Sequence, residues 1–333
     1  MNRSERRELI SLAQKMLGQK IEDIEFPGGK RRDSVRLIVA GGKRVIATRR
    51  PTSRRAEHEV GVLRALHDHG AKVPKVYGYK DGLLLQQDLG RSRLSETLHD
   101  RERKDDIPLL LGAALTSMAS VHQAGAMADL AEKVPLIGGE DAWCNGLAGT
   151  PHEVATMTGI KAPEYDRDAV ARLLAVRQPS FVKWDSRPGN ALVSKTDKVY
   201  WFDWEHCGAR NAADDFVWLM ADEFVTYSQE METRLFDKHL GAFEGPVTGE
   251  ELETYIRVLG CFHTCVRLEL ALHHKGDGKW WNLQRCIDGD KVGVNRRCCR
   301  RLLWRAQAWA DHDARTRPLV AWFKDLEEYV EAL

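Results

Sequence analysis

The spacing of apolar residues divides the chain into an extended first part and a helical second part. Short apolar and β-branched runs separated by glycines predict strands over 35–39, 44–49 and 84–87. Apolar residues at helical spacing predict helices over 53–67, 108–123, 166–176, 214–227, 250–273, 296–310 and 319–333. We therefore expect an α+β protein with a β-rich N-terminal lobe and a larger, mostly helical C-terminal lobe.

The boundary between these lobes is expected just after the strand at 84–87. A chain of 333 residues with 43% hydrophobic residues can bury a sizeable core. Single cores stop growing near ~250 to 300 residues, so two units are expected. We place the boundary at Asp88–Gly90, which gives an N-lobe of residues 1–88 and a C-lobe of residues 89–333.

The segment 181–205 carries the clearest candidate chemistry. Asp185 and Asn190 are separated by Ser-Arg-Pro-Gly, and Pro188 and Gly189 make this stretch a turn rather than a helix. The spacing D-x-x-x-x-N matches the kinase catalytic loop, in which the Asp meets the acceptor hydroxyl and the Asn holds Mg²⁺. Asp185 is therefore the candidate catalytic residue.

A predicted hairpin brings a second acid to the same place. The segments 191–193 and 199–204 are typical of paired strands, so Asn190 at the start of one lies beside Asp203 at the end of the other. An amide oxygen and a carboxylate suit Mg²⁺, which completes its shell with water and phosphate. We expect Asn190 and Asp203 to bind the metal. The plain structural alternative is a hairpin with polar ends.

The loop before the strand at 35–39 is a candidate phosphate-binding loop. Its glycines allow backbone N–H groups to approach phosphates, and its basic residues add positive charge. The nucleotide contacts expected here are Gly29, Lys30, Arg31 and Ser34. The alternative is an ordinary hairpin loop with solvated charges.

Glu59 is the candidate partner of a phosphate-binding cation. It lies beside the apolar stripe of the helix at 53–67, where a carboxylate is costly unless it is paired with a cation. The nearest predicted strand ends in Arg49 and Arg50. The alternative is a surface pair with Arg55 at helical spacing.

Taken in order, these pieces resemble the aminoglycoside phosphotransferase and choline kinase-like superfamily of small-molecule kinases. The resemblance spans about residues 26–219 and includes Gly28-Gly29, Thr48–Pro51, Glu59–Leu66, Val73–Val76, Leu84–Gly90, Asp185–Asn190 and Phe202–Glu205. It implies a two-lobed protein-kinase-like fold in which the N-lobe binds nucleotide. The C-lobe then carries the catalytic loop and the substrate site.

The resemblance also implies roles for individual residues. Asp185 is the base, and Asn190 and Asp203 bind Mg²⁺. The segment Gln86–Leu89 is the hinge whose backbone contacts adenine, which makes Gln87 and Leu89 nucleotide contacts. Arg49 occupies the position of the phosphate-binding lysine, and the donor is ATP.

Three departures from the family pattern stand out. Lys183 and Trp184 occupy the positions of a His-Gly pair before the catalytic Asp, and Arg49 replaces a lysine, which is not a conservative change. These departures motivate the alternative of a non-catalytic kinase-fold protein that binds nucleotide or a partner as a regulator. His122 falls where the family has a histidine that supports the catalytic loop.

The acceptor is expected to be a small molecule. Few residues separate Asp203 from the helix at 214–227, which leaves no room for the activation segment of a protein kinase. A sugar, amino sugar, amino alcohol or aminoglycoside fits this expectation. Candidate substrate contacts are Arg187, Glu205 and Asp215. Two alternative roles are open for Asp215: it caps the helix at 214–227, or it steadies the catalytic loop through Arg187.

Composition limits the other classes of protein to which the chain could belong. A net charge of +1 lacks the basic footprint of a nucleic-acid binder. No run of about eighteen apolar residues predicts a membrane span, and the N-terminus lacks the apolar region of a secretory signal. Seven irregularly spaced cysteines favour a reducing cytoplasm. The sequence leaves open ATP against GTP, the acceptor and the oligomeric state.

Overall fold

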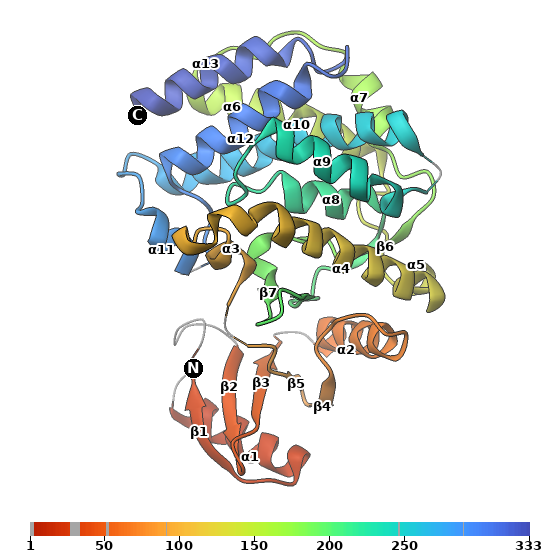
Figure 1. Cartoon of the computed structure of the whole chain (residues 1–333), viewed down its shortest axis with the longest axis vertical. Helices are drawn as coiled ribbons and strands as arrows, with labels where there is room; N and C mark the ends of the chain where they lie inside the picture. Colours follow the sequence, from red (N-terminus) through yellow and green to blue (C-terminus); the bar gives the residue numbers. More distant parts are fainter. Residues whose placement is uncertain (1–2, 27–33, 51–52, 91, 246, 289) are drawn as a thin grey trace.

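The fold has two parts, an N-terminal sheet with two helices and a larger helical part (Figure 1). The computed structural model describes residues 3–26, 34–50, 53–90, 92–245, 247–288 and 290–333. The predicted α+β architecture, with strands first and helices afterwards, is confirmed.

The N-terminal part is built on a five-stranded antiparallel sheet. Its strands are β1 (Ile21–Glu25), β2 (Ser34–Val39), β3 (Arg44–Arg49), β4 (Val76–Lys80) and β5 (Leu83–Gln87). They pair in the order β1-β2-β3-β5-β4. The three strands predicted from the sequence are β2, β3 and β5. The structure adds β1 and β4 at the two edges.

Alternation along the strands separates the two faces of this sheet. Val35 and Leu37 on β2 are buried in one cluster with Leu9 of helix α1 (Arg3–Leu17). Arg36, between them, points to the opposite face, because successive side chains of a strand alternate. Arg36 lines the large cleft of the molecule. One face of the sheet therefore packs against α1, and the other faces the helical part.

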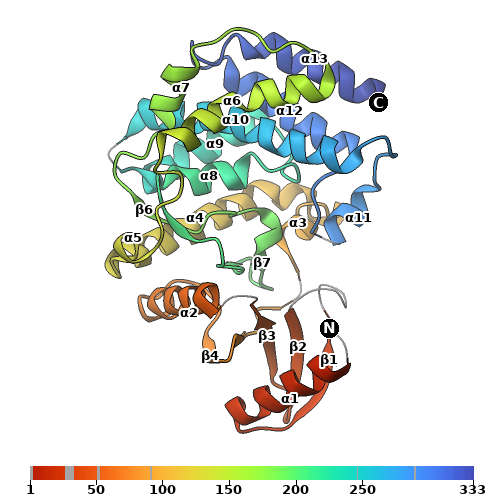
Figure 2. The same cartoon turned by 180° about the vertical axis from the view of Figure 1, so that it is seen from behind.

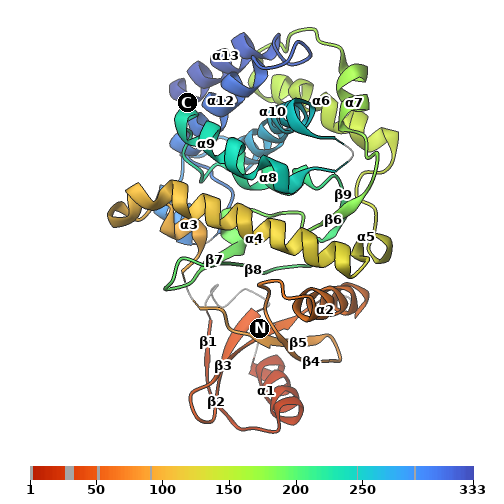
Figure 3. The ribbon, with the colours of Figure 1, turned by 45° about the vertical axis from the view of Figure 1, so that its right-hand side comes forward.

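Helix α2 (Ser53–Asp68) joins the two parts. Its apolar residues Val60 and Leu63 belong to the core cluster of the helical part. Figure 3 shows α2 between the sheet and helix α4 (Ile107–Met127). This position carries Glu59 into the space between the two parts.

The helical part is arranged around α4 and a long central helix, α10. Figure 2 shows α6, α12 and α13 on the side away from the sheet. Besides α4, the α-helices described in this part are α3 (Leu94–Thr97), α5 (Leu130–Lys133), α6 (Asp141–Thr158), α7 (Arg167–Leu174), α8 (Ala213–Met220), α9 (Gln229–His239), α10 (Gly249–Lys275), α11 (Leu283–Asp288), α12 (Arg296–Ala310) and α13 (Leu319–Ala332). α10 packs against α6, α8 and α12, and α12 packs against α13.

Two predicted boundaries are wrong. The helix expected over 214–227 ends at Met220, and Asp222 then accepts a hydrogen bond from the Phe224 N–H at 2.8 Å, as a turn residue does. The strand expected over 199–204 ends at Trp201.

The central helix α4 qualifies as a membrane span by length and composition alone, within the stretch Arg101–Met127. The sequence expectation of no such stretch is therefore corrected. In the fold, Leu110, Leu111 and Leu115 of α4 are buried in the core. The helix packs here as a core element.

Candidate active site

A cleft of about 620 Å³ lies between the sheet and the helical part. Its walls include Arg36 of β2 and Gln86 of β5 on one side and Asn190 and Asp203 on the other. This volume falls within the roughly 300 to 1,000 Å³ of small-molecule sites. The cleft is therefore large enough to hold a nucleotide-sized ligand.

Two short antiparallel strand pairs frame the predicted catalytic loop. β6 (Ser180–Val182) pairs with β9 (Gly208–Arg210), and β7 (Ala191–Val193) pairs with β8 (Val199–Trp201). The second pair is the predicted hairpin, which is confirmed. Its ends meet, because the N–H of Phe202 donates to the carbonyl of Asn190 at 3.0 Å.

Asp185, Arg187 and Asn190 form one hydrogen-bonded unit. Asp185 accepts from Arg187 Nε on Oδ1 and from Asn190 Nδ2 on Oδ2, both at 2.7 Å. Asn190 Nδ2 also donates to the backbone carbonyl of Asp185 at 2.9 Å, and no described residue donates to the Asn190 amide oxygen. Burial raises the pKa of Asp185, but Arg187 and Lys183 outweigh it and hold that pKa below its usual range. Asp185 is therefore a carboxylate at neutral pH.

The loop that carries Asp185 is conformationally strained. Trp184 and Asp185 have φ values of 53° and 52°, in the left-handed region that favours glycine. Residues held in such conformations persist only where their surroundings fix them. Asp215 supplies this support.

Asp215 accepts hydrogen bonds from the loop itself. The backbone N–H groups of Lys183 and Trp184 donate to its carboxylate at 2.7 and 2.9 Å, and the Ser186 hydroxyl donates at 3.0 Å. His122 Nε2 lies 2.8 Å from the same carboxylate, where the sequence predicted a supporting histidine. Asp215 is 1% exposed, so its predicted contact with substrate is wrong. It steadies the loop directly, without Arg187 as an intermediary.

Lys183 ties the two acid-bearing loops together. Its fully buried ammonium donates to the backbone carbonyl of Asp203 at 3.0 Å and to that of Asp185 at 3.4 Å. Burial lowers the pKa of Lys183, and the neighbouring carboxylates partly offset this effect. Lys183, which departs from the family pattern, therefore links the loops of Asp185 and Asp203.

Arg50 and Glu59 form a buried ion pair beside the metal-ligand candidate. Arg50 Nε lies 2.8 Å from Glu59 Oε2, and its Nη2 lies 3.0 Å from Oε1 and 2.8 Å from Asp203 Oδ1. Glu59 is 0% exposed. Burial opposes the charged form of Arg50, but Glu59 and the nearby carboxylates raise its pKa overall. The predicted cation partner of Glu59 is present.

That cation is Arg50, which corrects the expectation of Arg49. Arg49 is exposed and does not line the cleft, whereas Arg50 and Thr48 do. Side chains alternate along a strand, so Arg50 follows the direction of Thr48 and Arg49 points the other way. Glu205, expected as a substrate contact, lines the same cleft and lies 3.2 Å from Arg50 Nη1.

The predicted hinge borders the cleft at the end of β5. Gln87 and Leu89 line it, and among the described residues the N–H of Leu89 has no hydrogen-bond acceptor. Ser34, on β2 of the same sheet, also lines the cleft, and its hydroxyl is 2.8 Å from that of Thr48. The remaining expected contacts, Gly29, Lys30 and Arg31, lie outside the described residues.

Five carboxylates that line the cleft were not predicted from the sequence: Glu25, Asp88, Glu96, Asp288 and Asp290. Asp88 holds Arg36 through contacts of 2.6 and 3.2 Å. Asp290 lies 2.9 Å from Arg93 Nη1 and closes on the catalytic loop so tightly that a side chain at Gly189 would collide with it. Asp290 follows α11, far along the chain, and no spacing pattern connects it to the loop.

A second buried acid cluster lies near the catalytic loop. Glu223 pairs with Arg267 of α10 at 2.9 and 2.5 Å, and these contacts hold its pKa low despite burial. Burial and the charge of Glu223 raise the pKa of its neighbour Asp222. The cluster lies within electrostatic reach of Arg187.

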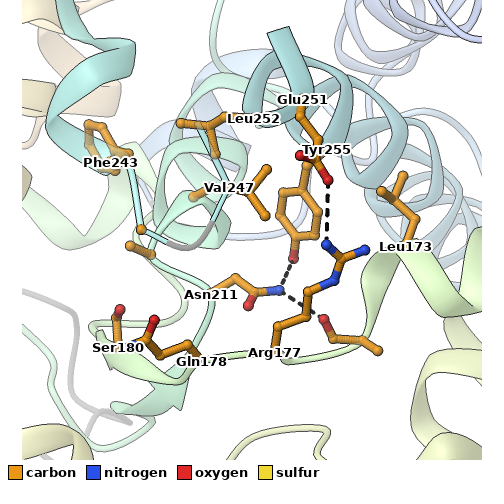
Figure 4. A pocket seen from close by; sticks show the side chains of 14 residues that line it. Leu173, Arg177, Gln178, Ser180, Asn211, Phe243, Val247, Glu251, Leu252 and Tyr255 are labelled. Atoms are coloured by element: carbon orange, nitrogen blue, oxygen red, sulfur yellow. Dashed lines mark hydrogen bonds and ion pairs between the residues drawn. The ribbon is translucent and has the colours of Figure 1, made fainter. Parts of the chain in front are cut away.

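Figure 4 shows another hollow, between the segment after α7 and the start of α10. Its volume is about 30 Å³, about the share of one water molecule. Asn211 donates to the hydroxyl of Tyr255 at 2.8 Å across it, and Arg177 pairs with Glu251 at 3.4 Å. It is too small for a nucleotide, so the large cleft is the candidate active site.

Several solved structures share this fold. A macrolide 2'-phosphotransferase type I superposes with a TM-score of 0.55 at 15% identity, over 83% of this chain and 94% of that one. A choline kinase from Streptococcus pneumoniae gives 0.53 at 12% identity, over 92% and 99%. Amicoumacin kinase, in complex with AMP-PNP and Ca²⁺, gives 0.52 at 12% identity, over 99% and 96%. No protein of curated function matches the chain significantly.

The family assignment comes from the sequence of the cleft and its surroundings. Residues 23–251 match the family described as APH, phosphotransferase enzyme family. This stretch includes the sheet, the hinge, the catalytic loop and Asp203. The chain therefore belongs to the phosphotransferase enzyme family, and it is a small-molecule kinase with a two-lobed kinase-like fold.

Proposed function

We propose that this enzyme transfers the γ-phosphoryl group of MgATP to a hydroxyl of a small molecule. The observation that carries the proposal is the unit of Asp185, Arg187 and Asn190, which Lys183 ties to the loop of Asp203. One solved structure of the same fold, amicoumacin kinase, is a complex with AMP-PNP and Ca²⁺, which supports a nucleotide with a divalent ion.

The residues present fit a magnesium ion. The amide oxygen of Asn190 accepts no hydrogen bond from a described residue, and Asp203 is 38% exposed with one oxygen on Arg50. Among the described residues no group of three or more His, Cys, Asp and Glu side chains could hold a metal. Asn190 and Asp203 would therefore share the ion with phosphate oxygens and water. Bound Mg²⁺ neutralises the charge that develops on those oxygens.

The remaining nucleotide contacts follow from the walls of the cleft. The N–H of Leu89, which donates to no residue that the structure describes, and the end of β5 at Gln87 suit the edge of a purine. Arg50, fixed by Glu59, is placed to pair with phosphate, and a guanidinium can clamp phosphate with two nitrogens. Ser34, with Gly29, Lys30 and Arg31 ahead of it, would cover the phosphates.

Asp185 acts on the acceptor. Its carboxylate accepts the hydrogen bond of the acceptor hydroxyl and takes that proton as the oxygen forms a bond to the γ-phosphorus. The bond from this phosphorus to the bridging oxygen of ADP breaks. A loose transition state asks little of a base, so the low pKa of Asp185 suits an orienting role. Arg187 Nη2 lies 3.9 Å from Asp290 Oδ1, and the terminal nitrogens of Arg187 donate no hydrogen bond to a described residue, so they can meet the transferring phosphoryl group.

The surroundings of Asp203 support a small acceptor. Only residues 204–212 separate it from α8, which leaves no platform for a peptide. All seven cysteines are buried and unpaired, and we propose a cytoplasmic location on this basis.

One observation favours the rival function, a regulator without turnover. Arg50 binds both Asp203 and Glu205, so a cation already occupies part of the space where Mg²⁺ would bind. A regulator of this kind would bind nucleotide and show no acceptor-dependent release of ADP.

The test measures binding and turnover separately. We expect MgATP to raise the melting temperature of the wild type, because ligands that bind only the folded state stabilise it. We expect ADP release to depend on an acceptor from a panel of sugars, amino alcohols and aminoglycosides. The Asp185→Ala variant should keep the thermal shift and lose turnover by about 10³-fold or more.

A thermal shift without turnover by the wild type on any acceptor would support the regulator. Wild-type-like turnover of Asp185→Ala would remove Asp185 from the mechanism.

A further inference from the structure

Three half-buried tryptophans meet beside the catalytic loop. Trp184 comes from the loop itself, Trp143 from the start of α6 and Trp218 from α8. The ring of Trp184 lies 5.3 Å from that of Trp218 and 6.1 Å from that of Trp143, measured between centroids. We call these three residues the tryptophan surface. Trp184 directly precedes Asp185, so this surface adjoins the reacting group.

The polar atoms of the tryptophan surface are free. None of its three indole N–H groups donates to a described residue, and none is a buried polar atom without a partner, so they reach solvent. Two of the core tryptophans differ: Trp204 donates to a backbone carbonyl at 3.1 Å and Trp309 to Glu232 at 2.9 Å, whereas the indole N–H of buried Trp201 has no partner among the described residues. Buried indoles normally find such an acceptor. The tryptophan surface therefore offers aromatic rings for stacking, and it also offers indole N–H groups that donate to no described residue.

The charge behind this surface disfavours a cationic ligand. Arg210 is 0% exposed, and its guanidinium lies 4.2 Å from the ring centroid of Trp143 and 6.0 Å from that of Trp184. Arg210 therefore already supplies a cation–π contact to these rings from the buried side. Arg210 is also paired with Asp214. Exposed Glu140 precedes Trp143, but water screens a charge in that position.

Asp185, which follows Trp184, is a carboxylate held by Arg187, and a further neighbour of the tryptophan surface is uncharged. His263 of α10 lies 4.5 Å from the ring of Trp218. Burial lowers the pKa of His263 to about 3, so the imidazole is neutral in solution near neutral pH. Its Nε2 is buried and has no partner among the described residues.

We propose that the tryptophan surface is the floor of the acceptor site and that it selects an uncharged, hydroxylated ring. The apolar face of the ring stacks on Trp184 and its edge contacts Trp218, because these two indoles are inclined at 66° to each other. Its oxygens accept hydrogen bonds from the indole N–H groups, and one hydroxyl reaches Asp185. This proposal rests on the proposed function. It separates this enzyme from relatives whose names specify cationic acceptors, such as choline.

The first experiment compares acceptors that differ in charge. The probes are glucose with glucosamine, galactose with galactosamine and inositol with streptamine, in which ammonium groups replace hydroxyls. Acceptor-dependent ADP release is measured for each. We expect the neutral member of a pair to have a kcat/KM about tenfold higher or more, the size of effect that one lost or repelled contact produces. Preference for the ammonium member overturns the proposal.

The second experiment removes the ring that adjoins Asp185. Trp184→Gly should fold well, because glycine tolerates a φ of 53°. We expect its KM for the neutral acceptor to rise about tenfold, with kcat changed less and KM for MgATP unchanged. Trp304→Phe, a change at a 38% exposed tryptophan on α12, is the control and should alter none of these. An unchanged acceptor KM in Trp184→Gly overturns the proposal.

The two proposals fail in different ways. One outcome is that MgATP raises the melting temperature while no member of any pair is phosphorylated. In that case the proposal that the tryptophan surface binds an uncharged ring is wrong, but phosphoryl transfer from the nucleotide to another class of acceptor is not contradicted. If MgATP does not bind, the proposed function itself fails.

Discussion

Two carboxylates of the active site, Asp203 and Asp215, lie in opposite environments. The side chain of Asp203 is 38% exposed in the cleft, with one oxygen on Arg50. Asp215 is 1% exposed, and its oxygens accept from two backbone N–H groups, a hydroxyl and His122. An acid with spare accessible lone pairs is available to a ligand, whereas an acid with every lone pair used holds the protein together.

Two neighbouring arginines differ in another way, by the face of the strand that they occupy. Arg50 faces the cleft and is anchored by Glu59, while Arg49 is exposed on the other side of the strand. Residue type and position in a motif do not decide between ligand contact and support. For the two acids, burial and the satisfaction of hydrogen bonds decide it, and for the two arginines the direction of the side chain does.

The largest expected effect is at Asp203. Asp203→Asn removes the charge that would hold Mg²⁺, and we expect turnover to fall by about 10³-fold with little change in melting temperature. Steady-state ADP release and thermal unfolding measure the two quantities. Asp197→Asn is the matched control, because Asp197 is also 38% exposed, has a positive φ and pairs with an arginine at 2.9 Å. Equal losses in both variants would contradict the assignment of Asp203.

A smaller effect is expected at Asp215, and it concerns the stability of the protein as well as turnover. Asp215→Ala leaves the N–H groups of Lys183 and Trp184 without their acceptor, so the free energy of unfolding should fall by about 3 kcal/mol. Urea unfolding measures this change. Glu230→Ala, at an exposed pair with Arg234, should have no measurable effect. A stable Asp215→Ala protein would show that the loop does not depend on this brace.

The smallest expected effect tests the two arginines. Arg50→Ala should weaken MgATP binding about tenfold, and Arg49→Ala should leave it within about twofold. Titration calorimetry of each purified variant measures the Kd. Arg50→Lys keeps the charge but loses the two-nitrogen contact, so an intermediate Kd is expected. A larger loss of MgATP affinity in Arg49→Ala than in Arg50→Ala would instead support the sequence-based expectation that Arg49 binds phosphate.

The parts of the site that the sequence predicted are those that local geometry brings together. Asp185 and Asn190 lie on one turn, and a hairpin returns Asp203 to them, so spacing and strand pattern suffice. The β-rich and helical parts follow from periodicity in the same way. Glu59 was recognised because a carboxylate beside an apolar stripe needs a cation.

Other features depend on information that spacing does not carry. A one-residue shift along a strand reverses the face, so the pattern could not choose Arg50 over Arg49. The burial of Asp215 depends on His122 and on the whole loop. Asp290 reaches Gly189 through the packing of the last helices, and a single sequence contains no signal for that contact.

The contact between Asp290 and the catalytic loop has a practical consequence for defining the minimal enzyme. The family match ends at residue 251, yet Arg267 and Asp290 lie beyond it. A fragment trimmed to residues 23–251 would retain the whole recognisable motif. It would also leave Gly189 uncovered and Glu223 as a buried charge without its counter-ion, so homology limits alone do not mark where this enzyme can be cut.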